Sequence, residues 1–283
     1  MTAKEAYHHL VGSLQANMDA REAANVTSIV FEDVFAWKQG HGNRPLSNLE
    51  QDKLGQIGHR LLTGEPLQYV LGMADFYGLK LRVSPAVLIP RPETEELVYQ
   101  ILEKAKDRSW KTALDVGTGS GCIPISLKKS RPDWIVSGMD VSQEALEVAR
   151  ENADLNEVNV LWKKQNVLAV QGWDTLPNYD LIISNPPYIP NREREIMTSS
   201  VLDFEPKLAL FVPDEDPFLF YRTILQMASI KLNSGGALFF EVNEFNARGL
   251  LEHVPEGLFE SVELIQDMQG KDRILYGQMA NSN

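Results

Sequence analysis

The sequence predicts an α/β fold in which helices cover both faces of a mostly parallel sheet. From residue 112 onward, short apolar runs of strand length alternate with segments that have helical spacing. Several of these runs are continuously apolar, as expected of strands with helices on both sides. A glycine-rich turn, Gly117 to Gly121, directly follows the first run, at the carboxyl end of a strand, where open α/β sheets bind ligands.

Length and composition indicate a globular cytoplasmic protein. The chain has 283 residues, 43% hydrophobic and 23% charged, which suffices for one large domain and one small one. No stretch approaches the roughly 20 apolar residues of a membrane helix, and Met1 to Glu5 does not lead into the apolar region of a signal peptide. The lone cysteine, Cys122, excludes an intramolecular disulfide and a cysteine-based zinc cluster. We therefore expect no membrane association and no bound metal.

The net charge of −12 argues against a nucleic-acid substrate. Binding to nucleic acid gains much of its free energy when clustered Lys and Arg release counterions from phosphates. The sequence contains no long basic run, and its overall field repels a polyanion. Folding could still assemble a local basic patch, so a nucleic-acid substrate remains an alternative. A protein or a small molecule fits the charge better.

The beginning of the chain is predicted to form a small helical module. Apolar residues recur at helical spacing over residues 3–18 and again over residues 21–38. Ser47 and Glu50 have the spacing of a capping box, which starts a helix that continues to about Leu62. Because a module of this size buries little surface alone, we expect it to dock on the rest of the chain.

A β-hairpin linker is predicted next. Residues 76–83 alternate between apolar and polar and suggest one strand, residues 87–89 suggest a second, and residues 84–86 supply the turn. A helix then begins at Arg91, with a proline and carboxylates in its first turn, where the helix dipole favours them.

The remaining sequence predicts seven strands and three further helices. The helices fit residues 121–130, 142–154 and 217–232. The strands are expected at residues 112–116, 135–139, 158–162, 179–184, 237–242, 261–266 and 273–279. The link between the last two strands is too short for a parallel pairing, so the sheet should end with one reversed strand.

The glycine turn predicts a nucleoside cofactor. Gly117, Gly119 and Gly121 let the backbone turn sharply and approach a ligand without obstruction by a Cβ atom. Asp140 ends the second strand, 23 positions after the first glycine, where a carboxylate can accept hydrogen bonds from both hydroxyls of a ribose. A glycine turn alone can be a simple tight connection; the strand before it and Asp140 after it favour the cofactor.

The residues around the turn favour S-adenosylmethionine over a dinucleotide. A dinucleotide fingerprint places its third glycine at residue 122, which is Cys122 in this chain. Asp115, just before the turn, disfavours a phosphate but favours an ammonium and a sulfonium group. A nicotinamide-dependent dehydrogenase is a remote alternative.

A second turn, Asn185-Pro186-Pro187-Tyr188, follows the apolar strand at residues 179–184. The two prolines remove two N–H donors, so the turn presents carbonyl oxygens, and the Asn185 side chain adds another acceptor. Such a site suits a substrate NH2 group, and Tyr188 offers a flat wall for a planar amide or base.

These acceptors suit methyl transfer to nitrogen. An amide nitrogen is a poor nucleophile because its lone pair is delocalised, and acceptors at Asn185 Oδ1 and the Pro186 carbonyl would orient it and stabilise developing positive charge. Alternatively, the two prolines simply end a strand and start the next helix.

The motifs resemble those of class I S-adenosylmethionine-dependent methyltransferases, and more closely the PrmC/HemK family of protein-glutamine methyltransferases. The resemblance covers nearly the whole chain. It is carried by the glycine turn, the Asn-Pro-Pro-Tyr segment, Gly64 to Gly72, Leu88 to Glu95, Phe204-Glu205-Pro206 with Ala209-Leu210, and Asp267 to Arg273.

The family resemblance implies a Rossmann-like seven-stranded sheet with one reversed strand, and methylation of N5 of the glutamine in the Gly-Gly-Gln motif of peptide chain release factors. We expect the protein to be a monomer. It implies a helical substrate-recognition domain over residues 1–72, a β-hairpin linker over residues 73–90 and a methyltransferase domain over residues 91–283. The implied cofactor-binding residues are Asp115, Gly117, Thr118, Gly119, Ser120, Gly121, Asp140, Val167 and Asn185. The implied substrate-binding residues are Asn185, Pro186, Pro187 and Tyr188, with Asn185, Pro186 and Tyr188 as the catalytic candidates.

Several interpretations stay open at this point. Asn166 stands where the family often has an acidic residue, which leaves the adenine contact undetermined. Glu241 either touches the cofactor pocket or ends its strand, and residues 90–95 either shape the substrate entrance or only start a helix. The alternative function is a methyltransferase for the amino group of adenine (N6) or guanine (N2) in nucleic acid. A non-catalytic adaptor that binds cofactor and a protein partner is a third hypothesis.

Overall fold

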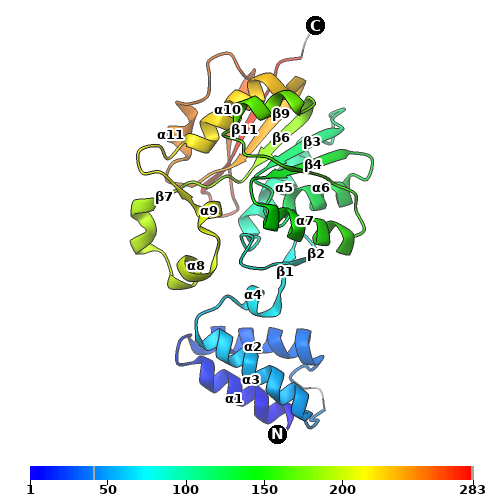
Figure 1. Cartoon of the computed structure of the whole chain (residues 1–283), viewed down its shortest axis with the longest axis vertical. Helices are drawn as coiled ribbons and strands as arrows, with labels where there is room; N and C mark the ends of the chain where they lie inside the picture. Colours follow the sequence, from blue (N-terminus) through cyan, green and yellow to red (C-terminus); the bar gives the residue numbers. More distant parts are fainter. Residues whose placement is uncertain (41, 282–283) are drawn as a thin grey trace. The chain divides into compact units, whose positions relative to one another are not determined.

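The computed structural model describes residues 1–40 and 42–281 of the chain. The chain forms two compact units (Figure 1). One comprises residues 1–73 and 198–204, and the other comprises residues 74–197 and 205–283.

The first unit is helical. Its helices are α1 (Ala3–Leu14), α2 (Ala20–Phe35), α3 (Asn48–Leu62), α4 (Leu67–Leu71) and α8 (Ser199–Phe204). The predicted first and second helices are present but end earlier than expected. Asp19 caps the start of α2 by accepting from the N–H groups of Arg21 and Glu22, so α1 must end before it. Ala36 adopts a left-handed conformation (φ 49°) and ends α2.

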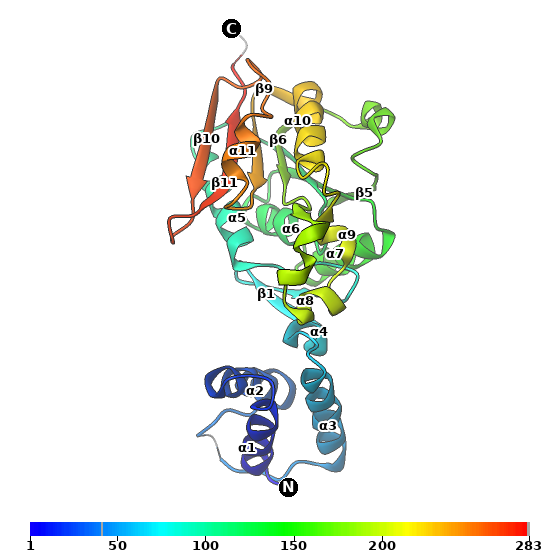
Figure 2. The same cartoon turned by 90° about the vertical axis from the view of Figure 1, so that its left-hand side faces the viewer.

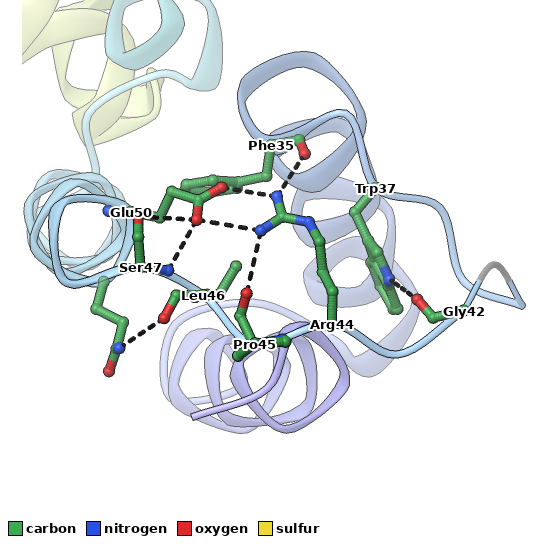
Figure 3. Close-up of polar contacts among 9 residues, drawn as sticks. Phe35, Trp37, Gly42, Arg44, Pro45, Leu46, Ser47 and Glu50 are labelled. Atoms are coloured by element: carbon green, nitrogen blue, oxygen red, sulfur yellow. Dashed lines mark hydrogen bonds and ion pairs between the residues drawn. The ribbon is translucent and has the colours of Figure 1, made fainter.

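The predicted capping box at the start of α3 is present and extends into a larger network (Figure 3). Ser47 Oγ accepts from the Glu50 N–H at 3.3 Å, and the Glu50 carboxylate accepts from the Ser47 N–H at 2.9 Å. The Arg44 guanidinium donates to both Glu50 oxygens and to the carbonyls of Phe35 and Pro45. The hydrogen bonds from Arg44 and then Ser47 lower the pKa of Glu50 to about 2. One carboxylate therefore starts α3 and ties the preceding loop to the end of α2.

A two-stranded hairpin follows, with a different turn from the predicted one. Its strands are β1 (Met73–Phe76) and β2 (Leu79–Arg82), joined at Tyr77 and Gly78, which both have positive φ (49° and 74°). The expectation of one strand over residues 76–83 and a second at 87–89 is wrong. The alternation of apolar and polar residues continues across the tight turn, so the pattern alone does not reveal it.

The second unit contains a seven-stranded sheet with the order β10-β11-β9-β6-β3-β4-β5. Its strands are β3 (Thr112–Val116), β4 (Ile135–Asp140), β5 (Leu161–Lys164), β6 (Tyr179–Ser184), β9 (Leu232–Glu241), β10 (Ser261–Gln266) and β11 (Asp272–Gln278). Strands β5, β4, β3, β6 and β9 pair in parallel, whereas β11 is antiparallel to both of its neighbours. The predicted fold class, with one reversed strand, is confirmed. A separate small sheet pairs β7 (Ile189–Pro190) with β8 (Phe211–Val212).

Helices bury both faces of the large sheet. Alternate strand residues such as Ala113 and Leu114 belong to different apolar clusters. One cluster contains residues of α5 (Pro92–Lys104), α6 (Cys122–Ser130) and α7 (Gln143–Leu155), and the other contains residues of α10 (Leu219–Lys231) and α11 (Ala247–Leu251). Figure 2 shows α5 and α10 on opposite sides of these strands. Short helices η1 (Val170–Thr175), η2 (Asn191–Ile196) and α9 (Lys207–Leu210) lie in the connections. In the described ranges, no helix is both long and apolar enough to cross a bilayer.

The Arg44–Glu50 pair predicts an acid-sensitive contribution to stability. The folded pKa of Glu50 lies below its ordinary value of 4.5, so the carboxylate stabilises the fold above about pH 4.5, and this contribution is lost as pH falls toward about 2. In Glu50→Gln, the side-chain oxygen can still accept from Ser47, but the charge is absent. We expect this variant to unfold at a lower temperature than the wild type at pH 7, and the difference to vanish at low pH. Circular dichroism melts across this range measure it, and a difference independent of pH would contradict the assignment.

Candidate active site

The predicted site lies at the carboxyl edge of the sheet, where three parallel strands end together. Val116 of β3 pairs with Met139 of β4 and with Ser184 of β6, so the connections after all three strands begin side by side. A cavity of about 330 Å³ opens between these connections. It is lined by residues 117–120 of the glycine turn and by Asn185, Pro186 and Pro187 of the second turn. The two turns therefore lie next to each other, at one edge of the sheet.

The glycine turn depends on backbone conformations that other residues rarely adopt. Gly117, Gly119 and Gly121 have φ values of 76°, 53° and 79°. A Cβ atom on Gly121 would also lie only 2.9 Å from the Trp162 ring. The Gly117 N–H donates to the carbonyl of Met139 at 2.9 Å, which holds the turn against the end of β4.

Asp140 occupies the end of β4 and lines the cavity. Its carboxylate accepts from the backbone N–H groups of Gly119 and Ser142, each at 2.9 Å. Burial raises its pKa from the ordinary value. Two backbone donors thus fix the carboxylate at the mouth of the glycine turn, where its remaining lone pairs can accept from a ligand's hydroxyl groups.

Asp115 lies buried at the end of β3, just before the glycine turn. It is 1% exposed, and among the described residues neither of its carboxylate oxygens has a hydrogen-bond partner. Burial, with the nearby Asp140 carboxylate, raises its pKa to about 7. Asp115 is not itself among the cavity-lining residues, but Val116 and Gly117 are. An ionised carboxylate in this position is costly unless a cationic group approaches it, directly or through water.

The second turn presents acceptors to the cavity. Asn185 Nδ2 donates to Thr94 Oγ1 at 3.4 Å, which leaves Asn185 Oδ1 as a side-chain acceptor. Ser184 Oγ donates to the Val116 carbonyl at 2.6 Å and joins β6 to β3 just before both turns. Tyr188, also predicted for this site, is absent from the cavity lining and packs against the apolar cluster beneath α10. Burial raises the pKa of its phenol to about 12, so the phenol stays protonated near neutral pH.

The structure adds residues that the sequence did not identify. Glu205, with a side chain only 1% exposed, forms an ion pair with Arg91 at 2.5 Å and accepts from the Ile89 N–H. This contact joins two walls of the cavity, at Ile89 to Arg91 and at Pro206 to Ala209. Phe220 and Ile224 of α10 complete the lining. The sequence motif that contains Glu205 does not reveal this ion pair, because Arg91 lies 114 residues away.

Both residues predicted near the adenine, Asn166 and Val167, line the cavity. Val167 lines the cavity, as expected of a residue beside an adenine ring. Asn166 also lines it, and its Oδ1 accepts from the Leu168 N–H at 3.0 Å, so its side-chain NH2 is left as a donor toward a ligand. In the described part of the chain, no group of three His, Cys, Asp or Glu residues is placed to hold a metal ion.

Comparison with known proteins identifies the family. Residues 94–203 match the methyltransferase small domain family, and residues 5–72 match the PrmC N-terminal domain family. The chain is 45% identical to the release factor glutamine methyltransferase of Bacteroides thetaiotaomicron, over 81% of this chain and 82% of that protein. It is 44% identical to the enzyme of the same name from Flavobacterium psychrophilum, over 81% of each. The chain belongs to the release factor glutamine methyltransferase family.

The fold agrees with this membership. A methyltransferase from Pyrococcus furiosus superimposes with a TM-score of 0.51 and 22% identity, covering 72% of this chain and 90% of that structure. The resemblance predicted from the motifs is confirmed, and the cofactor of this methyltransferase family is S-adenosylmethionine.

The cavity fits that cofactor. The positive-φ glycines bring backbone close to a ligand, the orphan carboxylate of Asp115 suits a cationic amino acid end, and Asp140 offers acceptors to a ribose. A volume of about 330 Å³ falls in the range of small-molecule pockets.

Because the pKa of Asp115 is about 7, we expect the affinity for S-adenosylmethionine to depend on pH. With a pKa of about 7, its ionised fraction rises from about one tenth at pH 6 to about one half at pH 7, so affinity should rise about five-fold over that interval. Asp115→Asn should bind about tenfold more weakly at pH 7.5 and lack this pH dependence. Isothermal titration calorimetry measures both. An equal pH dependence in the variant would assign the titration to another group.

Proposed function

We propose that this chain transfers a methyl group from S-adenosylmethionine to the side-chain amide nitrogen, N5, of the glutamine in the Gly-Gly-Gln motif of peptide chain release factors. The relatives that share 44–45% identity over most of their length carry the name release factor glutamine methyltransferase. One observation carries the proposal: the acceptor-rich turn at Asn185 to Pro187 and the glycine turn line the same cavity.

The second turn suits an amide NH2 group. Asn185 Oδ1 and the Pro186 carbonyl accept one N–H each and hold the nitrogen so that its lone pair faces the methyl group. Bound S-adenosylmethionine supplies an electrophilic methyl on a sulfonium, so the chain needs no strong base. As the N–CH3 bond forms and the S–CH3 bond breaks, the same acceptors stabilise the positive charge that develops on nitrogen. The surplus proton then leaves the nitrogen for solvent.

We assign two parts of the cofactor to the carboxylates of Asp115 and Asp140. Asp115 and the backbone of the glycine turn bind the methionine end, Asp140 binds the ribose, and Val167 packs against the adenine. The support is that neither carboxylate oxygen of Asp115 has a hydrogen-bond partner among the described residues, and that two backbone donors fix Asp140 at the cavity. The cofactor residues in this assignment are Asp115, Gly117, Thr118, Gly119, Ser120, Gly121, Asp140, Val167 and Asn185.

In this proposal, the ring of Tyr188 supports the Asn185–Pro187 turn and its phenol takes no part in proton transfer. Its phenol is not a general base, because burial raises its pKa to about 12. As the residue after Pro187, it supports the turn from the side of the apolar cluster. The substrate-binding residues are then Asn185, Pro186 and Pro187, backed by Tyr188.

The division of labour along the chain is also a proposal. Residues 1–72 recognise the release factor, residues 73–90 form the linker, and residues 91–283 carry the chemistry. The match of residues 5–72 to a family of N-terminal domains supports a separate role for the helical unit. We infer that the enzyme acts as a monomer in the cytoplasm, where release factors work.

A nucleic-acid amino group is the competing substrate, since it presents the same NH2 donors to the turn. The net charge of −12 and the family membership favour the protein substrate.

The test is mass spectrometry of a release factor after incubation with the enzyme and S-adenosylmethionine. We expect a gain of about 14 Da, one CH2, on the Gly-Gly-Gln peptide. Asn185→Ala removes a side-chain acceptor for the substrate and should lower kcat about 100-fold or more. Asn178→Ala, at an exposed residue just before β6 and at the opposite end of that strand from Asn185, is the matched control and should keep wild-type turnover.

An unmodified release factor, together with label transferred to RNA or DNA, would replace this proposal by its competitor. Unchanged turnover in Asn185→Ala would contradict the mechanism.

A further inference from the structure

The chemistry proposed for Asn185 depends on which end of its amide faces the substrate. An asparagine side chain carries an acceptor oxygen and a donor NH2 group of similar size. A half-turn about the Cβ–Cγ axis exchanges them and would set a donor against the donors of the substrate amide. The protein must therefore contain a feature that distinguishes the two orientations.

A buried chain of hydrogen bonds provides it. Asn185 Nδ2 donates to Thr94 Oγ1 at 3.4 Å, and Thr94 Oγ1 donates to Glu241 Oε2 at 2.6 Å. Thr94 is 2% exposed and Glu241 is 3% exposed, so water does not compete for either group. A hydroxyl has a single proton, and once Thr94 gives it to the carboxylate, its oxygen can only accept. Thr94 then selects the NH2 end of Asn185, and Oδ1 faces away from it.

The Thr94 hydroxyl has no competing role in its own helix. Thr94 is the third residue of α5 and not its N-cap, which is Arg91, so its hydroxyl is not needed to cap the helix. Pro92 in the first turn holds the helix start in place. Residues 92–94 therefore begin α5, and the Thr94 hydroxyl donates to Glu241, the last residue of β9.

We propose that Thr94 and Glu241 are positioning residues that hold the Asn185 side chain with its carbonyl oxygen toward the substrate amide. The inference rests on the proposed function, because the oxygen held in this way is the acceptor for the glutamine NH2. Thr94 lines the cavity and Glu241 does not, and in this arrangement both act on the substrate amide through Asn185.

Which atom donates in each of these hydrogen bonds depends on whether the Glu241 carboxyl is protonated. When the carboxyl is neutral, it can donate to Thr94 Oγ1, and the threonine proton then turns toward Asn185 and favours Oδ1 on that side. Burial raises the pKa of Glu241 to about 7. The acceptor orientation is thus favoured above this pH and lost below it.

Other groups around Glu241 act on the same equilibrium. Arg273 of β11 and Arg91 favour the ionised form, whereas Glu93 opposes it. Arg273 is itself paired with Asp267 at 3.3 Å, and Tyr221 donates to the Glu241 backbone carbonyl at 3.0 Å. The Tyr188 phenol and the Cys122 thiol also interact electrostatically with the Glu241 carboxylate. Burial raises the pKa of each to about 12, so both stay protonated near neutral pH.

The first experiment compares Thr94→Val with Thr94→Ser. Valine keeps the shape of threonine but lacks the hydroxyl, whereas serine keeps the hydroxyl. At saturating S-adenosylmethionine and pH 8, we expect kcat of Thr94→Val on a release factor to fall at least about tenfold, with unchanged cofactor affinity. Thr94→Ser should restore most of the rate. Equal kcat in wild type and Thr94→Val would overturn the proposal.

The second experiment follows pH. Under saturating cofactor, which removes the effect of Asp115 on binding, wild-type kcat should decline as pH falls through about 7. Glu241→Gln keeps an oxygen that can accept from Thr94 but does not titrate, so its kcat should show no such step. A step that persists in Glu241→Gln would overturn the proposal, and this comparison decides the matter even if Thr94→Val does not fold.

A third measurement separates failure of the positioning from failure of the proposed function. In the 15N-labelled enzyme without any substrate, the side-chain NH2 signals of Asn185, identified by their loss in Asn185→Ala, should shift as pH passes through about 7. The shift should be absent in Glu241→Gln. If release factors are not methylated but this titration occurs, the proposed function fails and the positioning stands. If methylation occurs but the signals do not titrate, the positioning fails.

Discussion

The parallel pairing of β3 with both β4 and β6 is the constraint on which the site depends. Parallel strands end at the same edge, so the register that sets Val116 beside Met139 and Ser184 also fixes where three connections begin. Each connection then has one task. In the proposed mechanism, the glycine turn approaches the cofactor, Asp140 supplies acceptors for its ribose, and the proline turn presents carbonyls to the substrate; all three line one cavity. Helices on both faces bury the strands, so the edge can vary in chemistry without loss of the core.

Two buried carboxyl groups near the site, Asp115 and Glu241, have different surroundings in the protein. Asp115 has no partner among the described side chains, and its charge is left for a cation that arrives with the ligand. Glu241 is equally buried but has Thr94 as a donor, and its charge is used inside the protein to orient another side chain. Both carboxyls have pKa values near 7, since burial disfavours their ionised forms. One buried acid thus serves binding and the other serves geometry.

Local signals in the sequence predicted most of the fold and part of the site. The glycines at 117, 119 and 121 are required by positive φ, and strands flanked by helices have a clear apolar pattern, so these features were predictable. Strand β5 begins at Leu161 rather than near residue 158, and the two-residue strands β7 and β8 are too short to leave a pattern. Contacts such as Thr94 with Glu241 join residues 147 positions apart, and no local rule connects them. The unexpected packing of Tyr188 away from the cavity likewise depends on α10, far along the chain.

The ion pair between Arg91 and Glu205 has a consequence for how the molecule is made. It spans 114 positions, and the Thr94–Glu241 contact spans 147, so the first can form only after Glu205 has been synthesised and the second only after Glu241 has been synthesised. A growing chain that stops before β9 already contains the glycine turn and the proline turn but has nothing to orient Asn185. In the proposed mechanism, the orientation of Asn185 therefore depends on a strand that is synthesised after both turns of the site.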